Sequence, residues 1–250
     1  WEGAPIYVAA ANHLHITNNT LEARDAYLSS ANAIECRSYL NDFQIRKNKI
    51  ESGYGGVVVE ISSYQDSIPD KGMIANNFIS AYQAALQMSG AKGTKIYFNS
   101  INLRDKNISQ TPYAVSLCDS CVYYNNIFAN QSGQGWIIEY FSSQVNDLIS
   151  DNNVFYTNHP GHFAIDFSTD DTLKNLNEFQ NQMGTDGHSF VAEPPFKSAT
   201  DLHLTNKAFK DSGRTVQEIS EDIDGEERNS GSPDIGADEI VKSTNMVPRD

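Results

Sequence analysis

The chain of 250 residues carries 32 acidic against 18 basic side chains, a formal net charge of −14 at pH 7. Nucleic acids are bound mainly through Lys and Arg, so this charge argues against a nucleic-acid partner. A hydrophobic content of 39% is typical of a folded chain, and no segment is long and apolar enough to predict insertion into a membrane.

A short pattern recurs in order through the first two thirds of the chain: an aliphatic residue, two variable residues, Asn, one variable residue and a second aliphatic residue. Its Asn residues are Asn19, Asn48, Asn77, Asn99, Asn125 and Asn152, in steps of 29, 29, 22, 26 and 27 residues. Steps of this length match the turns of a β-solenoid. When coils stack about 4.8 Å apart, each Asn can cap a bend and bond to its neighbours. A β-sandwich with Asn-rich turns is the alternative, but it does not require Asn at one fixed phase.

A second pattern of apolar, polar and apolar residues lies between the Asn repeats and is often preceded by Gly. This alternation predicts strands whose middle residue faces outward. The middle residues are Glu35, Glu60, Gln87, Ser116, Glu139 and Asp166. We therefore expect residues 1–170 to form an all-β parallel helix of about six to seven coils, each with at least two strands.

After residue 170 the repeats end. Leu173 to Met183 has helical spacing, and Gly184 is a typical stop signal. The end of a solenoid exposes strand edges that must be covered. Residues 171–250 are therefore expected to form a capping segment, with a short helix and an extended tail, at the C-terminal end of the solenoid.

Three phrases follow in the tail: Asp201-Leu202-His203-Leu204, then Asp222-Ile223-Asp224-Gly225 with Arg228, then Pro233 to Glu239. Together with the repeats, they resemble the C-terminal portion of secreted bacterial right-handed parallel β-helix proteins, a pectate-lyase-like group. The resemblance implies right-handed coiling, secretion, and an extracellular or cell-surface location. It is weak for function, because this group includes lyases, glycosidases, binding modules and surface proteins.

The column of outward carboxylates contains the candidate chemistry. Stacked carboxylates raise each other's pKa, which suits acid–base catalysis or cation binding. Glu139 and Asp166 are the catalytic candidates, because retaining glycosidases hold two carboxyl groups about 5–5.5 Å apart. The alternative is a solvated acidic column without a function. The predicted ligand-binding residues are acidic groups of the column and aromatic residues that can stack on sugar rings: Glu35, Glu60, Tyr97, Tyr123, Trp136 and Tyr140.

The sequence also contains candidates for metal and cysteine chemistry. Asp222, Asp224 and Glu226 cluster carboxylates beside Gly225 and could hold Ca²⁺, although a structural ion pair with Arg228 is the alternative. No His or Cys spacing is typical of a catalytic metal site, so no other cofactor is predicted. Cys118 and Cys121 form either a local disulfide or two thiols.

Two functions remain. The first is a non-catalytic extracellular module of a larger secreted or surface protein, which binds a polysaccharide or a cell-surface protein. The alternative is the C-terminal part of a polysaccharide-degrading enzyme, a glycosidase or lyase that uses the outward carboxylates. The first is favoured because six coils span only about 30 Å and the sequence shows no complete catalytic set. The N-terminal end of the solenoid is expected to pack on a preceding domain or another chain.

Overall fold

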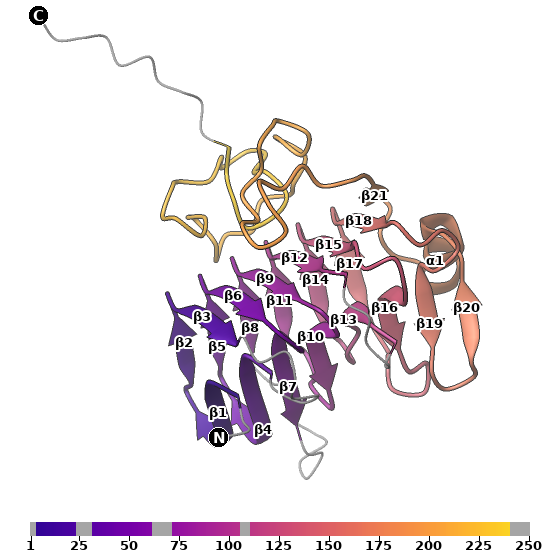
Figure 1. Cartoon of the computed structure of the whole chain (residues 1–250), viewed down its shortest axis with the longest axis horizontal. Coiled ribbons are helices and arrows are strands. Elements are labelled where there is room, and N and C mark those ends of the chain that lie inside the picture. The colour runs from indigo at the N-terminus through magenta and orange to yellow at the C-terminus, as the bar shows by residue number, and fades with distance from the viewer. Residues whose placement is uncertain (1–3, 24–31, 62–71, 106–110, 241–250) are drawn as a thin grey trace, which may run out of the picture.

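The computed structural model describes residues 4–23, 32–61, 72–105 and 111–240. These residues form an all-β parallel solenoid of about five turns with one short helix (Figure 1). The predicted fold class is confirmed, with slightly fewer turns than the six to seven coils expected. Three sheets, which we name A, B and C, run along the solenoid, because each turn contributes one strand to each of them.

Sheet A contains β1 (Ile6–Asn12), β4 (Ile34–Asn41), β7 (Val57–Ile61), β10 (Ala84–Ser89), β13 (Tyr113–Ser116), β16 (Trp136–Tyr140), β19 (Ala164–Asp166) and β20 (Asp171–Leu173). Sheet B contains β2 (His15–Thr17), β5 (Gln44–Arg46), β8 (Met73–Ala75), β11 (Lys95–Tyr97), β14 (Val122–Tyr124) and β17 (Ile149–Asp151). Sheet C contains β3 (Thr20–Ala23), β6 (Lys49–Ser52), β9 (Phe78–Ala81), β12 (Ser100–Leu103), β15 (Ile127–Asn130), β18 (Val154–Thr157) and β21 (Phe190–Val191). Neighbouring strands pair in parallel, except β19 with β20, which are antiparallel.

The Asn repeat forms the corner between sheets B and C. Aliphatic residues on both sides of the corner, such as Ile45 and Ile50, face the core. The residue just before each corner Asn adopts a left-handed backbone with φ between 52° and 59°. Asn tolerates this conformation better than most residues, and it occupies four of the six positions. The six residues are Asn18, Lys47, Asn76, Phe98, Asn125 and Asn152.

The corner amides bond to one another along the whole solenoid. Each side-chain Nδ2 donates to the Oδ1 of the Asn in the following coil, at 2.9–3.1 Å. This ladder consists of Asn19, Asn48, Asn77, Asn99, Asn126 and Asn153. Asn48 and the later members are fully buried, so the ladder satisfies backbone and amide groups that water cannot reach.

The last two ladder positions differ from the prediction, which placed Asn125 and Asn152 in the ladder. The register pairs Ile96 with Tyr123, not with Val122. An aromatic residue, Tyr123, therefore takes the core position in this coil. Val122, which the sequence pattern aligns with Ile96, lies one residue before it. Because side chains alternate between the faces of a strand, a slip of one residue exchanges inside and outside.

The C-terminal end of the solenoid is covered by α1 (Leu176–Met183), which confirms the predicted helix. Asn175 caps its first turn by accepting the Glu178 N–H, and Gly184 ends it with φ of 69°. Phe179 is buried against Phe163 at the last coil, with ring centroids 5.6 Å apart.

We expected the remaining tail to cover the C-terminal end of the solenoid as well, but residues 192–240 do not lie there. It runs back along the outer side of sheets B and C (Figure 1). Its contacts extend from Lys47, whose Nζ lies 2.8 Å from Glu221, to Asn152, which donates to the Ser212 carbonyl at 3.2 Å. The physical reason is that the outer side of sheets B and C carries apolar side chains, which the tail removes from water. Outward residues such as Phe98 and Ile127 are fully buried in clusters completed by tail residues.

Cys118 and Cys121 form a disulfide in the turn between β13 and β14, whereas Cys36 is a free thiol buried in the core. The helix that the structure describes is too short and too polar to cross a membrane.

Candidate ligand site on the outer face of sheet A

Glu139 lies on β16 and faces outward, as predicted. Its neighbours Ile138 and Tyr140 are both in the core, and the Glu139 side chain is partly buried. This burial raises the pKa of Glu139 to about 7. The expected cause was a stacked carboxylate, whereas the observed cause is removal of the carboxyl group from water.

Asp166 is not stacked on Glu139. The register pairs Glu139 with Ile165 and Tyr140 with Asp166, one position away from the predicted column. Asp166 is only 2% exposed and accepts the N–H groups of Ser142 and Ser168 at 3.0 and 2.8 Å. Although burial opposes it, these hydrogen bonds lower the pKa of Asp166. The carboxylate holds a turn, and the predicted catalytic pair is not formed.

Glu35 and Glu60 do not share a column either. Glu35 pairs with Val58 in the register, and Glu60 pairs with Arg37. The Arg37 guanidinium forms ion pairs with both carboxylates. The observed outward column is Glu35, Val58, Gln87, Ser116, Glu139 and Ile165, so stacked carboxylates do not build up along it.

Three of the four predicted stacking aromatics are buried. Tyr123 and Tyr140 are each 1% exposed within the core, and the Tyr123 hydroxyl donates to the Ser116 carbonyl at 3.2 Å. Tyr97 stacks on Tyr124 under the tail, with ring centroids 5.7 Å apart. Trp136 alone of these four stays partly exposed.

Trp136 and Glu139 flank a local irregularity of β16. The N–H groups of Ile137 and Ile138 both donate to the Phe163 carbonyl, at 3.1 and 3.0 Å. The usual alternation is therefore interrupted, so both isoleucines enter the core and the two flanking side chains remain partly exposed.

Two further residues complete this group, which we name the sheet A patch: Tyr113, Trp136, Glu139 and His162. Tyr113 pairs with Trp136 in the register, and burial followed by the Glu139 charge raises the pKa of its hydroxyl. His162 lies against the Trp136 ring in a tilted arrangement, with centroids 4.6 Å apart. The sequence pattern missed Tyr113 and His162, because their placement depends on which coil lies beside β16.

The predicted calcium residues do not converge on one point. Asp222 is fully buried, and its carboxylate accepts the N–H groups of Asp224, Glu226 and Glu239 at 2.8–3.0 Å. Arg228 pairs with Glu239 at 3.1 Å and has no hydrogen bond to the three predicted carboxylates.

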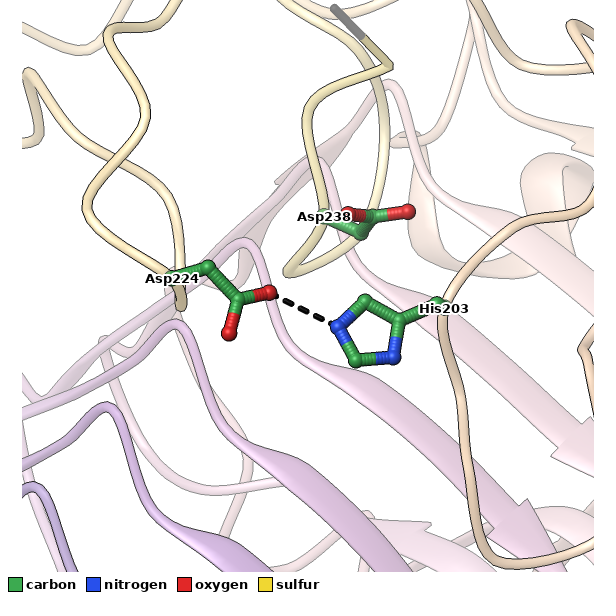
Figure 2. Close-up of side chains that lie close together, drawn as sticks. All are labelled: His203, Asp224 and Asp238. Atoms are coloured by element: carbon green, nitrogen blue, oxygen red, sulfur yellow. Dashed lines mark hydrogen bonds and ion pairs between the residues drawn. The ribbon is translucent and has the colours of Figure 1, made fainter.

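Asp224 instead meets His203 and Asp238 (Figure 2), with ligand atoms all within 4.8 Å of one another. Sequence reasoning missed His203 and Asp238 as a group. The available signal was that all three residues come from the tail phrases that carry the family resemblance.

No protein-family model, curated protein or solved structure matches this chain. The fold defines it as a parallel β-solenoid protein, and its place in the pectate-lyase-like group stays a prediction from the tail phrases.

Proposed function

We propose that the chain is a non-catalytic binding module of a larger secreted or surface protein, and that it binds glycans through the sheet A patch. The observation that carries this proposal is the placement of Trp136. Among the four predicted stacking aromatics it alone stays partly exposed, and it lies on the same strand as Glu139.

The chemistry of the patch suits a sugar. An indole ring packs well against the apolar C–H face of a pyranose ring while its N–H stays free to donate. A carboxyl group with a pKa of about 7 both donates and accepts hydrogen bonds near neutral pH. The patch therefore combines one apolar platform with one adaptable polar group, as hydroxyl-rich ligands require.

An extracellular location is supported by the Cys118–Cys121 disulfide, because disulfides persist mainly in oxidising compartments. The family resemblance of the tail phrases supports secretion by a bacterium. A cell-surface protein is the alternative partner for the same face.

A polysaccharide-degrading enzyme is the second candidate, because a raised carboxyl pKa suits a general acid. A retaining glycosidase also needs a second carboxyl group about 5–5.5 Å away. The column neighbours of Glu139 are Ser116 and Ile165, so the observed register favours binding over hydrolysis.

The test is a glycan array followed by calorimetric titration with the oligosaccharides that bind. Trp136→Ala is expected to abolish binding. Tyr39→Ala is the matched control, because Tyr39 is an exposed aromatic residue of the same sheet, on β4. A blank array, or equal loss of binding in both variants, would contradict the proposal. New reducing ends or unsaturated uronate absorbance that disappear in Glu139→Gln would replace it with the enzyme.

A further inference from the structure

Three tail segments that are distant in the sequence meet beside β6 and β9. They bring together His203, Asp224 and Asp238, whose ligand atoms all lie within 4.8 Å of one another (Figure 2). From the solenoid, Lys49 Nζ lies 2.7 Å from Asp224 Oδ1, and the Phe78 ring contacts the His203 ring edge to face, with centroids 4.8 Å apart.

The backbone around these side chains is fixed by hydrogen bonds. The buried Asp222 carboxylate holds the loop that carries Asp224, since it accepts the N–H groups of Asp224 and Glu226. The Leu204 N–H donates to Asp238 Oδ2 at 2.9 Å, which joins the His203 and Asp238 segments. Ligands held in this way lose little freedom when they bind a cation.

His203 has a carboxylate at each ring nitrogen. Its Nδ1 bonds to Asp201, and its Nε2 lies 2.7 Å from Asp224 Oδ2. A neutral imidazole has one N–H and one lone pair, so a proton or a cation must stand between one nitrogen and its carboxylate. A carboxylate on Nδ1–H that leaves Nε2 free is the arrangement that orients histidine ligands of metals.

The carboxylates of Asp224 and Asp238 lie close together, and within the described residues only Asp224 has a lysine partner, Lys49. Asp238 is only 8% exposed, its Oδ2 accepts the Leu204 N–H, and it forms no ion pair with any residue that the structure describes. A cation bound among these groups would relieve their repulsion.

We propose that His203, Asp224 and Asp238 bind a divalent transition-metal cation, with Asp201 and Lys49 as positioning residues. One imidazole nitrogen with carboxylate oxygens suits zinc, whereas calcium prefers six to eight oxygens. Zinc bonds of about 2.0–2.2 Å require side-chain rotations within the cluster. His203 and Asp224 are partly exposed, so water can reach a cation bound there. This site is separate from the sheet A patch and does not depend on glycan binding.

The test is calorimetric titration of the chelator-treated protein with ZnCl₂ alone. The full chain is expected to bind a single Zn²⁺, and His203→Gln and Asp238→Asn are each expected to abolish that binding. Asp201→Asn is expected to weaken it by about 10–100-fold, the usual cost of losing an orienting partner. Zinc is also expected to raise the unfolding temperature of the wild type but not of these two ligand variants.

Two controls separate this site from adventitious binding to other histidines. His188→Gln changes an exposed histidine that pairs with Asp151, and His162→Gln changes one that stacks on His159. Both variants are expected to bind zinc like the wild type. Absence of stoichiometric binding, its loss in His162→Gln or His188→Gln, or wild-type affinity in Asp238→Asn or in Asp201→Asn would overturn the proposal. The Asp201 variant also decides the case if His203→Gln does not fold, as checked by circular dichroism.

Discussion

The solenoid and the tail both bury polar side chains, but they arrange them differently. In the solenoid, one hydrogen bond between side-chain amides is repeated from coil to coil, from Asn19 to Asn153. In the tail, each buried group has its own role: Asp222 holds a loop, and Arg228 donates to Asn76, Gly236 and Glu239. A repeated bond distributes stability along the solenoid, whereas the tail depends on single residues whose loss no neighbour replaces.

The largest expected effect is at Arg228, which is 5% exposed and lies over the Phe98 ring. Arg228→Met leaves the buried Glu239 carboxylate without its cation, at a cost of about 3–5 kcal/mol. Limited proteolysis should then release the tail while the solenoid persists. Arg214→Met is the control, because Arg214 also covers an aromatic ring, Tyr124, but is exposed. Equal protease resistance of both variants would mean that the tail does not depend on single residues.

The second effect uses two adjacent residues. Asn153 is fully buried and belongs to the ladder, whereas Asn152 supplies a left-handed turn. Asn153→Ala leaves buried groups such as the Asn126 N–H unpaired, at a total cost of about 1–3 kcal/mol. Asn152→Gly can still adopt the left-handed backbone conformation, so it is expected to cost about 1 kcal/mol or less. Urea unfolding measures both. A larger loss of unfolding free energy in Asn152→Gly than in Asn153→Ala would support the register predicted from the sequence.

The third effect is a pH dependence of the free energy of unfolding, caused by Glu139 on the outer face of sheet A. The pKa of Glu139 is about 7 in the folded chain, above its ordinary value of 4.5. Between these values the folded state holds a proton that the unfolded state has lost, so stability falls as pH rises from about 4.5 to 7. The contribution is up to about 3 kcal/mol. Urea unfolding at several pH values should show a shallower decline in Glu139→Gln than in the wild type. The exposed Glu227→Gln is expected to leave the profile unchanged.

The smallest effect concerns the surface attachment of the tail. Glu221 pairs with Lys47 at 2.8 Å but is exposed, so the pair is screened by water and salt. Glu221→Gln is expected to leave the unfolding temperature unchanged in physiological salt. A clear decrease would show that exposed ion pairs, rather than Arg228 and the apolar clusters, hold the tail in place.

The sequence predicted the solenoid well because repetition makes the pattern visible. The inward positions of Ile45, Ile74 and Ile96 follow from it directly. The pattern failed at Tyr123, an aromatic residue that occupies an inward position and bonds through its hydroxyl to Ser116. The same kind of one-residue slip separated Asp166 from Glu139.

The candidate site was predicted less completely, for a physical reason. Glu139 could be named because strand alternation describes it, and Trp136 because it is an aromatic residue that can stack on a sugar ring. Tyr113 became a neighbour only through pairing with another coil. The meeting of His203 with Asp238 depends on how an irregular tail folds over the solenoid, and no spacing in the sequence encodes that distance.

The Asn ladder also gives the solenoid an electrical direction. Every amide points its N–H towards the following coil, so the side-chain dipoles add along the axis as peptide dipoles add in a helix. The positive end of this column lies at Asn153, whose Nδ2 is 3.2 Å from Oδ1 of the buried Asp186. A carboxylate therefore terminates the column where positive potential accumulates, much as an acidic residue does at the start of an α-helix.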